Sequence, residues 1–301
     1  MIQNGVLNVD KPAGLTSHDV VVRARRLLNI KKIGHAGTLD PDATGVLVLC
    51  IGKATRLVEY LMGMDKEYQA VMRLGVSTST QDASGEILEE KRWDSVSEED
   101  LKRCFMEFTG EITQIPPAFS AIKIDGVPSY KRARNGEEVR IPGRVVTIHH
   151  IDYLRKEGRD ILMKIHCSKG TYIRTLCHDI GRSLGTGAHL YSLRRLRSGP
   201  FEIAESITLE EISECVATKR IDMELYTMDD VMKSFPSISL DEWSEKKILH
   251  GSPLHLKEGE GEFLKNGNLV CLKSKSGTLV ALGIFENEKT KKIKIDKVLV
   301  Q

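Results

Sequence analysis

Apolar and polar residues follow two different periods along this chain, and these periods predict a mixture of helices and strands. From Thr16 or Ser17 onward, apolar residues recur at helical spacing up to residue 28, so either hydroxyl could cap a helix that buries one face. Ser97 opens a second such stretch, which Gly110 ends. Further helices are predicted for a short basic stretch between Pro128 and Gly136, from about Thr171, from the capping pair Thr208 and Glu211, and from Asp241 to Gly251.

Strands are predicted where apolar residues alternate with polar ones. The strongest alternation covers residues 67–74, in which Tyr68, Ala70, Met72 and Leu74 share one side. Further strands are predicted at about 45–51, 144–154 and 161–167, and Asp125-Gly126 predicts a small hairpin. Because strands outnumber the helical crossovers, we expect an α+β fold with a mixed, mostly antiparallel central sheet flanked by helices.

The pattern changes near residue 236, which divides the chain into two expected domains, 1–232 and 236–301. After the short helix that begins at Asp241, the second part consists of short apolar runs, glycine-rich turns and several lysines near its end. We therefore expect a small β-rich module that follows a larger α+β domain.

Composition adds little to this picture. The chain has 301 residues and a net charge of only +2, so overall charge does not mark a nucleic-acid binder and any such affinity must come from local patches. Two basic patches stand out: residues 131–144, which include Arg132 and Arg134, and the run Arg194–Arg197. Each could also be an ordinary solvated surface.

The six cysteines show neither paired nor regular spacing, so we expect reduced thiols and neither a disulfide framework nor a zinc ribbon. His166-Cys167 could suggest a metal site, but neighbouring residues of a strand point to opposite faces, so no metal is expected there. The chain has no apolar run that could span a membrane and no secretory leader, which predicts a cytoplasmic location.

Asp40 is the strongest candidate for chemistry. It lies in a glycine-punctuated loop ahead of the predicted strand at 45–51, and Pro41 restricts its backbone toward extended geometry. Such a loop can aim a side chain, although an Asp-Pro pair before a strand is usually turn chemistry.

Five segments, in their order and separation, give the chain a resemblance to a known family. They are residues 5–21, 34–49, 65–68, 74–85 and 167–176. Together they resemble the bacterial tRNA pseudouridine-55 synthases, the TruB family, through about residues 5 to 230. The C-terminal module resembles, in position and size, the PUA domain, an RNA-binding pseudobarrel that follows the catalytic domain in many of these enzymes.

The resemblance implies a pseudouridine synthase fold and the isomerisation of uridine to pseudouridine at position 55, in the T-loop of tRNA. The target base must be extruded from the folded T-arm before an enzyme can reach it. The reaction involves no redox change and no energy input, so no cofactor is expected. RNA-guided relatives of this family are conceivable, but the basic insertion at residues 120–144 resembles that of the stand-alone bacterial type. That type implies a monomer that requires no protein partner, with the insertion gripping the RNA.

Residue roles follow from the same resemblance. Asp40 matches the catalytic aspartate, which attacks either C6 of uracil or C1′ of ribose, and Arg174 matches the arginine that keeps this carboxylate charged. Tyr68 matches the tyrosine that stacks on the flipped base and assists removal of the C5 proton. The remaining matches are His35 and Tyr172 near the flipped nucleotide, Lys11 and Pro12 in a motif that supports the pocket, and Asp82, which orders the arginine or its loop.

Two other classes of function fit the sequence less well. A tRNA-binding protein that assists folding without chemistry would use the same basic patches but would not need Asp40, Arg174 and Tyr68 together. A glycoside hydrolase would need two acids placed across a sugar bond. Asp42 lies only two residues from Asp40 and no other second acid stands out, so this class ranks last.

The basic insertion makes a testable contribution to RNA binding. Neutralising Arg132 and Arg134 together should weaken tRNA binding and reduce the slope of log affinity against log salt concentration by about one to two, because fewer counterions are released. Filter binding over a range of salt concentrations measures this slope. An unchanged slope would show that the insertion does not grip the RNA.

Overall fold

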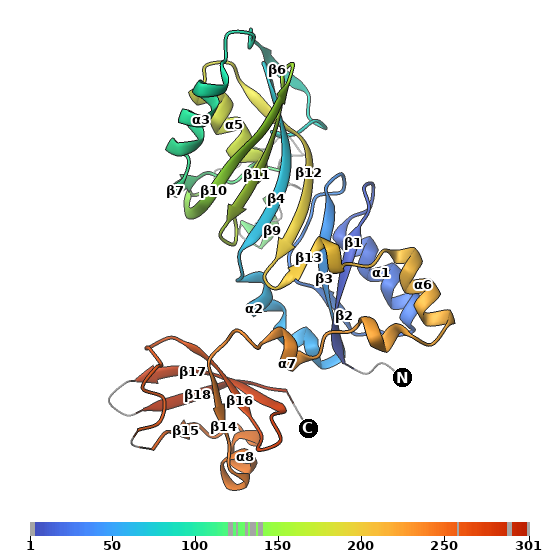
Figure 1. The fold of residues 1–301 in the computed structure, drawn as a ribbon, viewed down its shortest axis with the longest axis vertical. Helices are drawn as coiled ribbons and strands as arrows, with labels where there is room; N and C mark the ends of the chain where they lie inside the picture. The colour runs from blue at the N-terminus through green and yellow to red at the C-terminus, as the bar shows by residue number, and fades with distance from the viewer. Residues whose placement is uncertain are drawn as a thin grey trace.

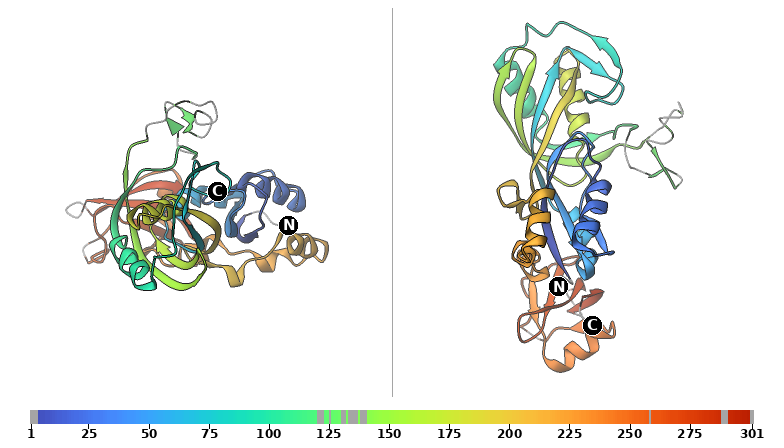
Figure 2. Two further views of the ribbon diagram at one scale, coloured as in Figure 1. Left: turned by 90° about the horizontal axis from the view of Figure 1, so that it is seen from above. Right: turned by 90° about the vertical axis from the view of Figure 1, so that its right-hand side faces the viewer.

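The computed structural model describes residues 4–119, 123–124, 126–129, 132, 137, 141–257, 259–287 and 291–299. The molecule is elongated, with a large mixed sheet and its helices at one end and a smaller β module at the other (Figures 1 and 2). No helix in the described ranges is both long and apolar enough to cross a membrane.

Nine strands of the described chain form the central sheet. Its main path runs β1 (Gly5–Lys11), β3 (Thr44–Ile51), β12 (Ala188–Ser198), β4 (Lys66–Leu74), β11 (Asp160–Cys167), β10 (Arg144–Glu157) and β7 (Gly110–Gln114), with β2 (Ile33–His35) on β3 and β13 (Phe201–Glu202) on β12. All neighbours pair antiparallel except β3 and β12, which are parallel. The predicted mixed, mostly antiparallel sheet is therefore confirmed.

Two helices cover the β1–β3 half of the sheet. Capping boxes satisfy the first backbone N–H groups of α1 (Ser17–Leu28) and α6 (Leu209–Ala217). The box on Thr208 was predicted, and of the two predicted caps of the first helix, Thr16 is the one used. Their apolar faces share one core with the inward side chains of β1 and β3. This half of the sheet anchors the loop that carries Asp40.

A second pair of helices covers the β4–β10 half. The helices α3 (Glu98–Glu107) and α5 (Ile173–Ser183) bury Leu101, Phe105 and Leu176 against alternate residues of β4, β10 and β11. Ser97 caps α3 as predicted, but the helix ends before Gly110, which begins β7 at a φ of 102°. The predicted helix near Thr171 begins at Ile173, because the Thr171 hydroxyl donates to the Ser168 carbonyl in the preceding turn.

The parallel junction of β3 and β12 joins the two halves. Arg195 lies opposite Gly45, whose φ is 100°. A Cβ at Gly45 would lie 2.2 Å from the Arg195 carbonyl oxygen, so only glycine permits this approach. The close pairing places β12 directly beside the Asp40 loop.

The module after residue 236 has its own sheet and core. The strand order is β14 (Ser237–Ser239), β16 (Leu269–Lys273), β17 (Leu279–Asn287), β18 (Lys292–Val298) and β15 (Leu254–His255), and Asp241 caps α8 (Glu242–Leu249) as predicted. Val270, Leu272, Val280 and Phe285 are buried inside this sheet together with Ile248 of α8.

The module is docked on the larger domain by an apolar cluster and several polar contacts. Residues of η1 (Gly52–Leu57), α2 (Val58–Met62) and α7 (Met228–Val231) share a core with Cys271, Leu279 and Leu299. The Tyr60 hydroxyl contacts the Asp296 carboxylate, and Lys297 pairs with Glu59 at 3.0 Å. The segment that leads into β4 therefore rests on the module.

The remaining described elements are short. Strands β5 (Val76–Thr78) and β6 (Ile87–Glu90) form a separate hairpin, while η2 (Ile203–Glu205) and η3 (Ile221–Glu224) flank α6. The predicted hairpin around Gly126 is present as β8 (Lys123–Ile124) and β9 (Val127–Pro128), which stands away from the main sheet (Figure 2), while Asp125 lies outside the described residues. Ser129 and Arg132 are helical, and the rest of the predicted basic helix, including Arg134, lies outside the described residues.

Candidate active site

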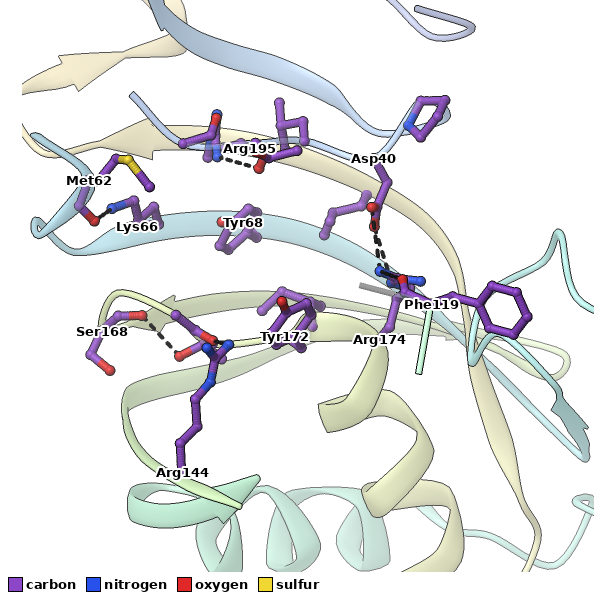
Figure 3. Close-up of a pocket in the computed structure, with 18 residues that line it drawn as sticks. Asp40, Met62, Lys66, Tyr68, Phe119, Arg144, Ser168, Tyr172, Arg174 and Arg195 are labelled. Carbon is purple, nitrogen blue, oxygen red and sulfur yellow. Dashed lines mark hydrogen bonds and ion pairs between the residues drawn. The ribbon is translucent and has the colours of Figure 1, made fainter. Parts of the chain in front are cut away.

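A cavity of about 480 Å³ opens between the Asp40 loop, β4, β12 and the start of α5 (Figure 3). Its size is in the range of ligand pockets, about 300–1,000 Å³. Four of the residues proposed from the sequence line it: Asp40, Tyr68, Tyr172 and Arg174. The fold therefore brings together side chains that are up to 134 positions apart in sequence.

The Asp40 carboxylate is paired with the Arg174 guanidinium on the cavity wall (Figure 3). Arg174 Nε lies 3.1 Å from Asp40 Oδ2, and Nη2 donates to Oδ1 at 3.4 Å. The Arg174 side chain is only 7% exposed, whereas that of Asp40 is 45% exposed. The arginine is thus fixed in the protein, and the carboxylate it holds remains accessible.

Three further acceptors fix the Arg174 guanidinium. Nη1 lies 3.3 Å from Asp82 Oδ2 and donates to the Thr80 carbonyl at 3.4 Å, and Nη2 donates to the Phe119 carbonyl at 3.1 Å. The other Asp82 oxygen accepts from the Thr80 and Ser84 hydroxyls, at 2.6 Å each. Asp82 therefore orients Arg174 from the side opposite Asp40.

The surroundings of Asp40 act on its pKa in opposite directions. Desolvation raises the pKa of this carboxyl, and the nearby Asp82 and Asp42 charges act the same way. The Arg174 charge opposes the rise, with a smaller contribution from Lys11. The net result is a pKa above the ordinary value, so the pairing with Arg174 is what favours the charged form in this partly enclosed site.

Buried donors satisfy the backbone of the Asp40 loop. Arg195 donates to the carbonyls of Gly37 and Thr38 at 3.1 and 3.4 Å. The Ser17 hydroxyl donates to the Leu39 carbonyl at 3.2 Å and accepts from the Leu39 N–H at 2.9 Å. The loop is therefore held by side chains from β12 and α1, with Asp40 directly after the residue that Ser17 clamps.

Lys11 completes this support. Its ammonium is fully buried and donates to the carbonyls of Pro41, Pro12 and Leu15 at 2.8, 2.9 and 2.6 Å. Burial lowers the pKa of Lys11, and the Asp42 and Asp40 charges oppose this shift. These three carbonyls occupy the donors of Lys11, so its contribution to the site is the position of the loop.

Tyr68 is buried on β4, directly opposite Arg195 on β12, and lines the cavity. Burial raises the pKa of the Tyr68 hydroxyl, and the Arg195 charge opposes the rise. The ring is thus a neutral phenol at neutral pH, with its one polar atom near a fixed cation.

Tyr172 forms the opposite wall as the residue that precedes α5. Gln114 accepts from its backbone N–H at 3.0 Å and donates to its carbonyl at 3.3 Å. The Arg144 guanidinium lies 4.6 Å from the centre of the Tyr172 ring and donates to the Gly170 carbonyl. Two polar side chains thus fix the place of this aromatic ring.

Several proposed residues lie elsewhere. His35, on β2, is half-buried and does not line the described cavity; burial and the Arg195 charge lower its pKa. Pro12 is exposed beside the turn that Lys11 holds. The interpretation of Arg194–Arg197 as a solvated basic patch is wrong for Arg195, which is 1% exposed and holds the loop.

Lys66 is the main cavity residue that the sequence analysis missed. It is 6% exposed, its ammonium donates to the carbonyls of Met62 and Met64, and burial lowers its pKa to about 8. Lys66 shares the inward face of β4 with Tyr68. The alternation that identified Tyr68 therefore also marks Lys66, two residues earlier.

Comparisons with known proteins show the family to which the chain is similar. Residues 25–173 match the sequence model described as TruB family pseudouridylate synthase (N terminal domain), and residues 174–236 match the tRNA pseudouridylate synthase B C-terminal domain. The chain is 41% identical over 300 residues to the tRNA pseudouridine synthase B of Clostridioides difficile, covering 99% of this chain and 100% of that protein. It is 45% identical over 258 residues to that of Pelotomaculum thermopropionicum, covering 84% and 82%.

Two solved structures are similar over nearly the whole chain. A Cbf5-Nop10-Gar1 complex contains a chain that matches with a TM-score of 0.77 at 34% identity, over 98% of this chain and 85% of that one. A chain of an archaeal box H/ACA sRNP Nop10-Cbf5 complex matches with a TM-score of 0.76 at 31% identity, over 99% and 87%.

The role of Arg195 in holding the loop can be tested against its neighbour. Arg195→Lys replaces three fixed N–H contacts, to Gly37, Thr38 and Val46, with one ammonium that cannot reach them all. We expect a loss of about 2–4 kcal/mol in the free energy of unfolding, because buried carbonyls lose their donors. Urea denaturation of the wild type and the variant measures this difference in the free energy of unfolding.

Arg194→Lys is the matched control. Arg194 is 40% exposed and pairs with Asp10 at 2.7 Å, so its replacement should cost less than about 1 kcal/mol. Equal losses in the two variants would contradict the loop-holding role of Arg195.

Proposed function

The chain belongs to the TruB family of pseudouridylate synthases, and on this premise we propose that it modifies the T-loop uridine of tRNA with Asp40 as its nucleophile. It is a tRNA pseudouridine synthase, an isomerase that converts uridine to pseudouridine. The observation that carries the proposal is the accessible Asp40 carboxylate, held by a buried arginine at the wall of a cavity that two tyrosines also line.

The chemistry requires a charged carboxylate in an enclosed site. The N-glycosidic bond between uracil N1 and ribose C1′ breaks, the base turns, and a C5–C1′ bond forms, while C5 loses one proton and N1 gains one. An ionised Asp40 can start this sequence by attack at C1′ or at C6. Arg174 supports the ionised form by its charge and fixes the direction of the carboxylate by its two contacts.

We propose that Tyr68 stacks on the extruded uracil. Aromatic stacking recovers on the order of 1–3 kcal/mol of the energy lost when a base leaves its stack. Because burial keeps the Tyr68 hydroxyl protonated, it can orient a water or share its proton more readily than it can act as a phenolate. The Arg195 charge next to it favours any transient negative charge on the phenol oxygen.

Tyr172 and His35 are proposed to contact the flipped nucleotide or the gap that it leaves. Tyr172 lines the cavity with Arg144 stacked against its ring, so the pair offers an aromatic face and a cation to a nucleotide. His35 would act from outside the cavity, where its lowered pKa favours a neutral imidazole. Lys11 and Pro12 would act by supporting the Asp40 loop, and Asp82 would act by orienting Arg174.

The remaining proposals concern RNA binding and assembly. We propose that the insertion around residues 120–144 and the PUA-like module bind tRNA outside the cavity, and that the protein works in the cytoplasm as a monomer without a protein partner. The full-length match to a protein named tRNA pseudouridine synthase B supports tRNA as the bound RNA. The solved relatives named above are chains of multiprotein complexes. The mass of the protein in solution, measured by light scattering, would test the proposed monomer.

Substitution of Asp40 tests the nucleophile. Asp40→Asn should lower pseudouridine formation in an unmodified tRNA transcript by at least about 10³-fold, because the amide cannot attack, while tRNA binding is kept. Chemical labelling of pseudouridine followed by primer extension should give a stop at the T-loop uridine with the wild-type protein only.

Asp42→Asn is the control, since Asp42 is exposed and two residues away in the same loop. A fully active Asp40→Asn variant would remove Asp40 from the chemistry. Tight tRNA binding by a wild-type protein that forms no pseudouridine would favour the non-catalytic tRNA-binding alternative.

The ion pair predicts a shift in pH dependence. Activity should fall as pH decreases through the Asp40 pKa, because protonation removes the nucleophile. Arg174 opposes the rise of that pKa, so Arg174→Gln should move the acidic limb of the pH profile to higher pH by about one to three units, as well as lower the maximum rate. The measurement is single-turnover rate against pH. An acidic limb that stays in place would mean that Arg174 does not set the charge of Asp40.

A further inference from the structure

Two imidazoles and one carboxylate converge on the exposed side of the sheet, from three neighbouring parts of the chain. Asp65 lies just before β4, His149 on β10 and His166 on β11. Asp65 Oδ2 is 3.0 Å from His149 Nε2 and 3.8 Å from His166 Nε2, and the three ligand atoms all lie within 4.8 Å of one another. Between one third and one half of each side chain is exposed, so the cluster is reachable from solvent.

We propose that Asp65, His149 and His166 form a binding site for a divalent transition-metal ion of the zinc class. Metal–ligand distances of about 2.0–2.2 Å place neighbouring ligands of a tetrahedral ion about 3.3–3.6 Å apart. The observed separations lie around this value, so small side-chain rotations would complete the site. Imidazole and carboxylate ligands suit zinc, with water as the fourth ligand.

A β-bulge directs His149 into the cluster. The register of β10 against β11 shifts between Ile148 and His150, which leaves His149 as the extra residue. Without the bulge, inward and outward positions would alternate through this stretch of β10. With the bulge, Ile148 and Ile151 are both buried and His149 faces outward. Its ring lies 4.6 Å from the ring of His166. The irregularity thus builds the contact between the two imidazoles.

The alternation of β11 decides which of two neighbouring residues can bind metal. Cys167 is fully buried in the core, whereas His166 is on the solvent side. The sequence argument that His166 and Cys167 cannot share a metal therefore holds. The fold instead places two other possible metal ligands beside His166: His149, which is 17 positions away in sequence, and Asp65, which is 101 positions away.

The contact with Arg197 shows that His166 Nε2 carries a lone pair. Arg197 Nη2 lies 3.2 Å from this nitrogen, and a guanidinium can only donate. Nε2 of His166, the nitrogen that faces Arg197, also lies 3.8 Å from Asp65 Oδ2. Arg197 also donates to the Gly199 carbonyl at 3.3 Å, so it competes with a metal for Nε2 and would have to move aside when the ion binds.

The charged groups around the cluster do not favour a ligand other than a metal cation. Glu67, opposite His166 on β4, is paired with Lys164 at 3.0 Å. An anion such as phosphate could use Arg197 and the imidazoles, but the Asp65 carboxylate would repel it. The cluster therefore favours a cation.

Isothermal titration of the full-length, chelator-stripped protein with Zn²⁺ alone tests the site. We expect one ion per chain, and His149→Ala should weaken binding by more than about tenfold. Loss of a residue that only hydrogen-bonds to a metal ligand already costs about this much, and His149 would be a ligand itself. His150→Ala is the matched control, because His150 neighbours His149 but pairs with Asp152 at 2.6 Å instead. It should bind Zn²⁺ as the wild type does.

Arg197→Ala adds a test with the opposite sign. Removal of the competing guanidinium should tighten Zn²⁺ binding, which adventitious binding at Cys215 or elsewhere would not predict. Zn²⁺ should also raise the Tm of the wild type and not that of His149→Ala, whose Tm in chelator should match the wild type. The proposal is overturned if the wild type binds no Zn²⁺, if His149→Ala binds it unchanged, or if Arg197→Ala binds it more weakly.

Discussion

The active site depends on hydrogen bonds to five consecutive backbone carbonyls in the Asp40 loop, which has no regular secondary structure. From Gly37 to Pro41, the acceptors are satisfied by Arg195, Ser17, the Ala43 N–H and, at Pro41, both Lys11 and the Gly14 N–H. Each such group would cost about 1–3 kcal/mol if it were buried without a partner. The loop can therefore adopt one conformation at low cost, and that conformation places Asp40 at the cavity wall.

The charges at the site are arranged so that a nucleophile can be both accessible and ionised. Arg174 is shared between Asp40 and Asp82, and two backbone carbonyls complete its coordination. Because Asp82 is itself held by Thr80 and Ser84, the guanidinium has a fixed position before substrate arrives. Such preorganisation means that the protein need not reorganise its dipoles during the reaction.

The parallel contact of β3 with β12 joins these parts. It brings Arg195 under the Asp40 loop and, on the other edge of β12, opposite Tyr68. One buried guanidinium thus connects the carboxylate loop with the proposed stacking tyrosine. The C-terminal module supports the same region from outside, since it packs on η1 and α2, which lead into β4.

Local sequence determined the helices with capping boxes, the alternating strand of Tyr68 and the tight hairpin at Gly126, because each depends on residues close together in the chain. The resemblance of five segments predicted the family and singled out Asp40 and Arg174, which the structure brings to one cavity. Strand β12 was not predicted because two register shifts interrupt its alternation. Its arginines therefore suggested a surface patch, and only tertiary structure identified Arg195 as a buried support. Contacts between distant segments likewise revealed Lys66 at the cavity and the Asp65, His149 and His166 cluster, because no local pattern encodes a neighbour that the sheet supplies.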